Sequence, residues 1–250
     1  MNAILAIPAD GPLFEGHFPG RPILPGVALL ALVADALGRS AALRGIAFAR
    51  LRQQVFPGDE LAIAAREVAP DRLRVDVTRG RAVVANGELE FGRLSIADAA
   101  ISVAAQAAGA AFPETLLPHR PPMRFVTGVL TEPPDGLVCE ARIPAGCGLV
   151  REGTAPATAA IEAVAQCAAL WEALGRARAS GAPLARVGYL VSLRDIRLHA
   201  ARIPADSAFR VSIALDEAAM PLTWYRMEIA LARERIASGG IATYLTDEPA

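Results

Sequence analysis

The sequence contains no lysine, so arginine supplies all 25 of its basic residues. These oppose 26 acidic residues and leave a formal net charge of −1, which argues against a dedicated nucleic-acid binder. Without lysine, any contact with an anion must come from a guanidinium group, whose planar fork suits phosphate oxygens. Hydrophobic residues make up 53% of the chain and charged residues 20%, which excludes an intrinsically disordered protein.

Cysteine and histidine are also scarce, with three residues of each. Cys139, Cys147 and Cys167 show neither CxxC spacing nor a paired framework, so we predict no metal site and no disulfide. A reducing compartment, the cytoplasm, is the expectation. The first residues lack a basic stretch followed by a long apolar one, so no signal peptide is predicted. The apolar run 23–34 is short and broken by a Pro-Gly pair, so no membrane span is predicted.

Two segments have the pattern of buried helices, Gly26–Leu37 and Ala157–Arg176, and each follows a proline. Proline suits a helix start, because its missing N–H would be unpaired there anyway. Gly38 and Gly175 lie where helix C-termini are expected. Apolar residues nearly surround the first helix, which places it inside a core.

Strand patterns accompany both helices. After the first helix they cover 46–55, 60–68, 72–78 and 82–94; before the second they cover 125–131 and 137–143, and after it 188–199, 208–215, 222–232 and 236–245. Asn86-Gly87 and Asp135-Gly136 are typical hairpin turns. A helix wrapped by a curved antiparallel sheet is the simplest packing that buries such a helix. We therefore predict an α+β fold given twice, with the two helices side by side under one continuous sheet.

The repeat divides the chain into an N-terminal half at 1–96, an Ala-rich linker at 97–112 and a C-terminal half at 113–250. The segment 14–27 reads FEGHFPGRPILPGV and contains His17, the first half's only histidine. Its three prolines stiffen the loop. The N–H groups of the helix that starts at Gly26 would point into the same region and could stabilise an enolate oxygen. A lone histidine is more often an ordinary hydrogen-bonded side chain, so the surrounding motif has to favour catalysis.

The motif GHFPGxPIxPGV closely resembles the signature of the bacterial 3-hydroxyacyl-acyl-carrier-protein dehydratases of the hotdog superfamily. The resemblance continues in 45–61 and covers most of 3–94. In the second half, LLPHRPPM (116–123) and PATAAIEAVAQ (156–166) resemble the opening segment and the central helix of the same family. The second half is most similar to the divergent dehydratase-like proteins of aryl-polyene gene clusters, and the first half to their companion dehydratase. The resemblance implies a double hotdog, a fused pseudo-dimer.

Each half departs from the family's catalytic pair. In the family, the catalytic carboxylate lies fourteen residues after the catalytic histidine. That position is Ala31 in the first half and Glu162 in the second, whereas Gly148 stands fourteen residues before Glu162. In the family's homodimers the histidine comes from one subunit and the carboxylate from the other. The resemblance therefore implies one composite site of His17 and Glu162, and a second, inactive pair of Gly148 and Ala31.

Four side chains near these positions need a role. Glu162 has apolar neighbours, so we expect it to be buried with a raised pKa, as suits a general acid. Gln166, one turn later, either orients Glu162 or makes a polar contact between helices. His119 is usually structural in the family, and Asp35 would belong to the inactive pair. We therefore expect His119→Ala and Asp35→Ala to spare activity.

Arginines make the first half's loop and following strand basic. Arg21, Arg50 and Arg52 either form a solvated face or contact an acidic carrier protein or the phosphate of a phosphopantetheine arm. The expected partner is thus an acyl-carrier-protein or coenzyme A thioester, with no nucleic acid. A homodimer of pseudo-dimers is compatible with the sequence.

The implied reaction is loss of water from a 3-hydroxyacyl thioester to give a trans-2-enoyl thioester. His17 would remove the C2 proton, the Gly26 N–H would bind the thioester oxygen, and Glu162 would protonate the departing hydroxyl. No metal or cofactor is required, because the thioester acidifies C2 and the phosphopantetheine belongs to the substrate. The acyl chain would lie between the two helices. Two alternatives stay open: an acyl thioesterase on the same fold, and a non-catalytic carrier-protein-binding partner of a dehydratase complex.

Overall fold

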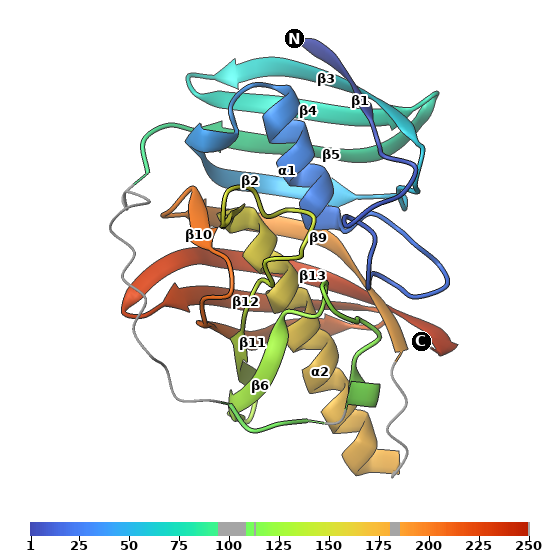
Figure 1. Ribbon diagram of the computed structural model, residues 1–250, viewed down its shortest axis with the longest axis vertical. Helices are drawn as coiled ribbons and strands as arrows, with labels where there is room; N and C mark the ends of the chain where they lie inside the picture. Colours follow the sequence, from blue (N-terminus) through green and yellow to red (C-terminus); the bar gives the residue numbers. More distant parts are fainter. Residues whose placement is uncertain (95–108, 113, 181–185, 250) are drawn as a thin grey trace.

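A computed structural model describes residues 1–94, 109–112, 114–180 and 186–249 (Figure 1). The predicted linker, 97–112, lies mostly outside these residues. Within them, no helix combines the length and hydropathy of a membrane-spanning segment.

Eleven antiparallel strands form one sheet in the order β1-β3-β4-β5-β2-β9-β13-β12-β11-β7-β6. The first half supplies β1 (Asn2–Ala6), β2 (Leu43–Leu51), β3 (Glu60–Ala69), β4 (Arg72–Arg79) and β5 (Ala82–Phe91). The second half supplies β6 (Val126–Thr131), β7 (Gly136–Ala141), β9 (Arg186–Leu198), β11 (Phe209–Ala219), β12 (Leu222–Leu231) and β13 (Glu234–Pro249). The short strands β8 (Thr154–Pro156) and β10 (Arg202–Pro204) pair separately.

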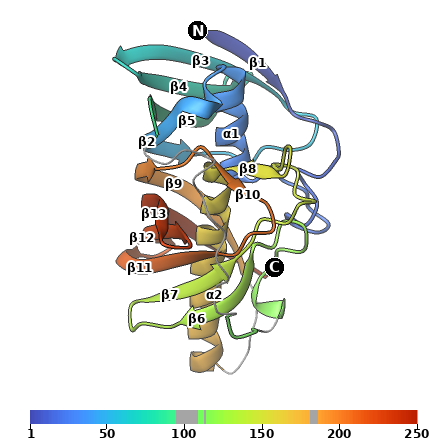
Figure 2. The same cartoon turned by 60° about the vertical axis from the view of Figure 1, so that its left-hand side comes forward.

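The two halves join where β2 pairs with β9. The register runs from Gly45 opposite Arg197 to Arg50 opposite Ser192. The Ser192 hydroxyl also donates to the carbonyl oxygen of Ala49 across this pair, at 3.1 Å. Both views show the sheet passing from one half to the other without a break (Figures 1 and 2). The predicted continuous antiparallel sheet is therefore confirmed.

Both predicted helices form. The first begins directly after Pro25, and the second begins after a short turn that follows Pro156. The first, α1 (Gly26–Ala36), ends as predicted: Gly38 has φ +67° and its N–H donates to the Asp35 carbonyl oxygen, while the Arg39 N–H reaches Ala34. The second begins as a 3₁₀ turn, η4 (Ala157–Ala160), and continues as α2 (Ile161–Ser180). Two further 3₁₀ turns are η1 (Ser40–Ala42) and η3 (Glu114–Leu116).

The predicted stop at Gly175 is wrong, because α2 continues to Ser180. A single glycine lowers the stability of a helix interior by only about 1 kcal/mol. The ion pair between Glu172 and Arg176, four residues apart, spans this glycine at 3.7 Å.

The helices do not lie side by side along their length, as the sequence had predicted. Figures 1 and 2 show α1 and α2 following one another along the same face of the sheet, each across its own half. They meet where α1 contacts η4, the turn that leads into α2. The reason is the edge-to-edge junction at β2 and β9, which extends the sheet and places each helix over its own strands.

Asn86-Gly87 is not the predicted hairpin turn. Both residues lie inside β5, where Asn86 pairs with Asp76, and the turn between β4 and β5 contains Gly80 with φ +59°. Gly87 is needed because β2 approaches closely: a Cβ there would come within 2.6 Å of the Phe48 carbonyl oxygen. The other predicted turn, at Asp135-Gly136, does separate β6 from β7.

Candidate active site

His17 lies in the loop between β1 and α1 and is 7% exposed. Its Nδ1 is 2.9 Å from the carbonyl oxygen of Ile23, and the Ile23 N–H donates to the His17 carbonyl oxygen. The carbonyl can only accept, so Nδ1 carries a proton, and Nε2 of the neutral ring holds a lone pair. Burial lowers the pKa of His17 to about 4, although Glu162 opposes this shift. At neutral pH the ring is therefore an uncharged base.

Glu162 lies in the first turn of α2 and is 3% exposed. Its Oε1 is 3.3 Å from His119 Nε2 and 3.3 Å from Gln166 Nε2. Burial raises the pKa of Glu162. Three other effects lower it by more than burial raises it: the hydrogen bond from His119, the charges of the two histidines when protonated, and the hydrogen bond from Gln166. The net shift is downward, so the expectation of a raised pKa is wrong in the free protein. Burial is offset by donors that prefer the carboxylate.

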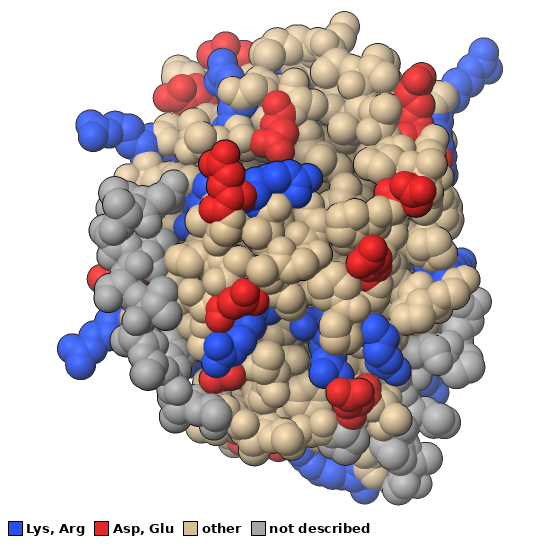
Figure 3. Space-filling view, viewed as in Figure 1, with Lys and Arg blue, Asp and Glu red and all other residues tan. Residues whose placement is uncertain are grey.

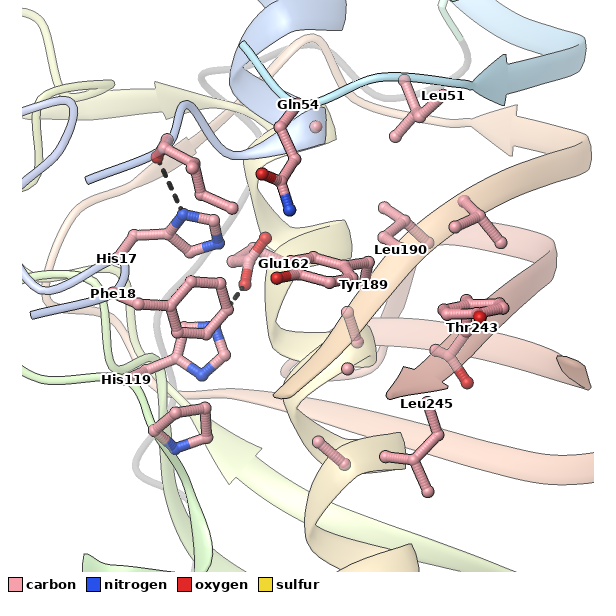
Figure 4. Close-up of a pocket in the computed structure, with 18 of the residues that line it drawn as sticks. His17, Phe18, Leu51, Gln54, His119, Glu162, Tyr189, Leu190, Thr243 and Leu245 are labelled. Carbon is pink, nitrogen blue, oxygen red and sulfur yellow. Dashed lines mark hydrogen bonds and ion pairs between the residues drawn. The ribbon is translucent and has the colours of Figure 1, made fainter. Parts of the chain in front are cut away.

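The structure brings His17, His119 and Glu162 together. One ring nitrogen of each histidine and one carboxylate oxygen of Glu162 lie within 4.8 Å of one another, and all three side chains are buried. His17 and Glu162 thus meet across the two halves. In Figure 4 the rings of His17, Phe18 and His119 stand on one side of Glu162, and Tyr189, Leu190 and Thr243 on the other.

His119 is the member that the sequence interpretation assigned to structure alone. A close approach between the halves places it there: Gly16 has φ +81°, and a Cβ at Gly16 would come within 1.9 Å of the Arg120 carbonyl oxygen. The Arg120 N–H donates to the Gly16 carbonyl oxygen at 3.0 Å. The glycine before one histidine therefore packs against the residue after the other. The sequence contains both pairs, Gly16-His17 and His119-Arg120, but only the fold shows that they pack against each other.

Two imidazoles and a carboxylate could also hold a divalent metal ion. Metal-bound histidines usually donate their second ring N–H to an oxygen acceptor. His17 does so, toward Ile23, but Nδ1 of His119 has no hydrogen-bond partner among the described residues. The surroundings of the three side chains therefore fit proton transfer better than metal binding.

A cavity of about 360 Å³ begins at this cluster. One face of α2 lines it from Glu162 to Arg176, which corresponds to roughly 21 Å at about 1.5 Å per residue. The facing walls are β9 at 188–191 and β13 at 243–245. Ala165 and Ala169 on α2 leave room along this path. The cavity does not lie between the two helices, where the acyl chain was predicted: it follows α2 against the sheet, and among the described residues α1 contributes only its first turn.

Gly26 lines the same cavity as the three side chains, and Gln166 contacts Glu162 from one turn further along α2. Gly26 begins α1 and lines the cavity, where a Cβ would come 2.3 Å from the Leu51 side chain. Gln166 is fully buried; it accepts from the Phe125 N–H at 2.8 Å and donates to the Met123 carbonyl oxygen at 2.7 Å. The expected contact to Glu162 is present, whereas the alternative of a polar contact between helices is not what the structure shows, because Met123 and Phe125 lie in the segment that leads into β6.

Of the three arginines predicted to meet an anion, only Arg52 lines the cavity, where its Nε donates to Asn86. Arg21 and Arg50 are exposed outside it. Figure 3 shows arginine and acidic side chains interspersed on one face of the molecule.

The second pair, Ala31 and Gly148, lies at a smaller cavity of about 130 Å³, together with the exposed Asp35. A Cβ on Gly148 would come within 2.5 Å of the Leu13 backbone nitrogen and 2.6 Å of the Pro12 carbonyl carbon. The chain thus fills the place where a histidine side chain would begin, and the second pair lacks both reactive groups.

Comparison with known proteins agrees with this arrangement. The ApeP-like family, described as ApeP dehydratase, matches residues 112–250, and the ApeI-like family, described as ApeI dehydratase, matches 1–88. The FabZ 3-hydroxyacyl-[acyl-carrier-protein] dehydratase of Pelotomaculum thermopropionicum is 37% identical over 93 residues, 33% of this chain and 64% of that protein. The FabZ of Ruminiclostridium cellulolyticum is 33% identical over 105 residues, 36% of this chain and 73% of that protein.

Two solved structures share the fold over nearly the whole chain. The dehydratase domain of RzxB from Pseudomonas fluorescens has a TM-score of 0.67 at 15% identity, covering 97% of this chain and 93% of that one. A trans-AT polyketide synthase dehydratase domain from Brevibacillus brevis has a TM-score of 0.71 at 11% identity, covering 99% and 94%. The chain therefore belongs to the hotdog-fold dehydratase family, as an ApeI-like half fused to an ApeP-like half.

Proposed function

We propose that the protein is a 3-hydroxyacyl-thioester dehydratase that forms a trans-2-enoyl thioester at one composite site. The observation that carries the proposal is the meeting of His17 and Glu162, from different halves, at one end of an elongated cavity. His17 offers a bare Nε2 as a base, and a carboxylate oxygen of Glu162 lies within 4.8 Å of one nitrogen of that ring.

In the proposed reaction, Nε2 of His17 takes the C2 proton of the substrate. The electron pair of that C–H bond forms the C2–C3 double bond as the C3–O bond breaks, and Glu162 in its acid form protonates the departing hydroxyl to give water. The N–H of Gly26, at the positive end of α1, binds the thioester oxygen while enolate character develops. The proton on His17 then returns to Glu162, directly or through one water, and the site is restored.

In the free protein, only one of the two reactive groups has the protonation state that the reaction needs. His17 is already neutral, whereas Glu162 must acquire a proton before it can act as an acid. A bound acyl chain excludes water from the cavity and so strengthens the effect of burial, which raises the pKa of a carboxyl group. Binding of the substrate thus favours the acid form of Glu162.

Substrate recognition at the mouth is assigned to Arg52, the cavity-lining arginine among the three predicted anion contacts. Its guanidinium would meet the phosphate of a phosphopantetheine arm, which both carrier-protein and coenzyme A thioesters contain.

Product analysis tests the proposal. The protein is incubated with 3-hydroxyacyl thioesters of several chain lengths, on carrier protein and on coenzyme A. We expect an enoyl thioester without release of free thiol. Free thiol together with a 3-hydroxy acid would identify an acyl thioesterase instead, and no turnover of any substrate would favour a non-catalytic carrier-protein-binding partner.

The acid limb of the activity profile should lie near pH 4 rather than near the usual histidine pKa of 6.5. The base form of His17 is lost only when the pH drops below its lowered pKa. Protonation of His17 should therefore not reduce kcat/KM as the pH is lowered from 7 to 5. The measurement is kcat/KM from pH 4 to 8, with circular dichroism to establish that the fold persists. A half-loss of kcat/KM near pH 6.5 as the pH is lowered would contradict the assigned base, whereas a loss as the pH is raised would reflect ionisation of Glu162.

A further inference from the structure

His119 is a buried ionisable side chain at the site that the proposed reaction does not use. We propose that His119 is a positioning residue for Glu162, donating its Nε2–H to Oε1 so that Oε2 is left to face the substrate hydroxyl. The inference rests on the proposed function for its kinetic consequence, but its structural part, the tautomer of His119, can be tested without turnover.

The tautomer follows from the surroundings of the two ring nitrogens. His119 is 5% exposed, and Nδ1 is buried without a hydrogen-bond partner among the described residues. A proton on Nδ1 would therefore be a buried N–H without an acceptor, which is unfavourable. Nε2 lies 3.3 Å from Glu162 Oε1 and has an acceptor there (Figure 4). His119 is thus the Nε2–H tautomer, the opposite of His17.

The ring of His119 is held by contacts on several sides. Its centroid lies 4.9 Å from that of Phe18 and 5.3 Å from that of His17. The Arg120 guanidinium donates to the carbonyl oxygens of His119 at 2.9 Å and Leu117 at 2.8 Å, which fixes the backbone around the ring. A donor held this firmly can orient a carboxyl group with little loss of side-chain entropy.

The consequence for Glu162 is directional. Within the described chain, both hydrogen-bond donors to this carboxyl group, His119 and Gln166, meet the same oxygen, Oε1. Oε2 is therefore the oxygen available to a ligand. As Glu162 gives its proton to the leaving hydroxyl, negative charge develops on the carboxyl group and the bond from His119 strengthens. That bond stabilises the transition state more than the bound substrate, so it acts on kcat rather than on KM.

The same bond sets the strength of the acid. A donor to the carboxylate lowers the pKa of Glu162, and its removal must raise it. The other groups that face Glu162 are His17, Gln166 and the thiol of Cys147, whose own pKa is raised by burial. These groups are unchanged when only His119 is replaced.

The tautomer is tested by ¹⁵N–¹H correlation spectra of the histidine rings near neutral pH. The chain has three histidines, and single His17→Ala, His119→Gln and His199→Gln variants assign them. We expect His17 to be protonated at Nδ1 and His119 at Nε2. A proton on Nδ1 of His119, or a doubly protonated ring, would overturn the proposal whether or not the protein is a dehydratase.

The kinetic role is tested with a matched pair of variants. His119→Phe keeps a ring but removes the donor, and His119→Gln keeps an N–H near the position of Nε2. We expect His119→Phe to lower kcat by about 10–100-fold with little change in KM, the range typical of a hydrogen bond to a charged group, and His119→Gln to recover most of the loss. The alkaline limb of kcat should move to higher pH in His119→Phe. His199→Gln should leave kcat unchanged.

A structural role alone predicts a different result. Both variants would then lose activity in parallel with thermal stability, and the alkaline limb would stay in place. Wild-type kcat in folded His119→Phe would also overturn the proposal and would restore the expectation that His119 can be replaced without loss.

Discussion

Replacing His17 with alanine, or Glu162 with glutamine, should lower kcat for dehydration by about 10²–10⁴-fold, the range that a general acid or base contributes. His17→Ala removes the base at Nε2, and Glu162→Gln removes the acid while keeping the shape of the side chain. The double variant should be little worse than the slower single variant, because the two groups act in one proton-transfer unit. The measurement is steady-state turnover of a 3-hydroxyacyl thioester, with circular dichroism to check folding.

Asp35→Asn is the matched control for these variants. Asp35 is an exposed carboxylate beside the second cavity, four residues after Ala31, so its loss should leave turnover unchanged. If folded Glu162→Gln kept full activity, or if Asp35→Asn were the slower variant, the acid would have been assigned to the wrong cavity.

Replacing Gly16 with alanine should reduce activity by roughly 10²-fold or more. The new Cβ would lie within 1.9 Å of the Arg120 carbonyl oxygen, so the loop and the second half must move apart. That movement displaces His17 relative to Glu162, and a misplacement of about 1 Å can cost about 10²-fold in rate. The measurement is kcat/KM together with the thermal midpoint.

Gly20→Ala separates this clash from backbone strain. Gly16 and Gly20 both have φ +81°, but a Cβ on Gly20 would meet no heavy atom within 4 Å. Both variants therefore pay a similar cost of about 1–2 kcal/mol for a left-handed residue with a side chain, and only Gly16→Ala separates the reactive groups. Equal losses of activity in the two variants would show that strain in the loop, and not the contact between the halves, controls the site.

Local sequence patterns predicted the elements whose ends are determined by residues next to them in the chain. Pro25 and Gly38 bound α1 because their backbone restrictions act on the residues beside them. His17 and Glu162 could be paired because the resemblance to a family supplied a spacing and a rule for combining halves. The structure then brought the two side chains together, while their catalytic roles remain predictions.

The features that the sequence did not predict depend on contacts between distant segments. Asn86-Gly87 has the composition of a turn, but the close approach of β2 requires the glycine inside a strand. His119 approaches Glu162 only because Gly16 packs against Arg120, and no local pattern encodes that contact. The downward shift of the Glu162 pKa has the same origin, since apolar neighbours in sequence indicated burial but not the donors that offset it.

The pairing of β2 with β9 has a consequence for stoichiometry. Two separate hotdog halves could assemble in three combinations, and only the mixed one would place His17 beside Glu162. On one chain the halves are always present in equal number, and the second is supplied at an effective concentration that does not fall when the protein is dilute. The shared sheet also occupies the edge of β2 that a like half would need. The yield of complete sites is thus independent of how much protein the cell makes.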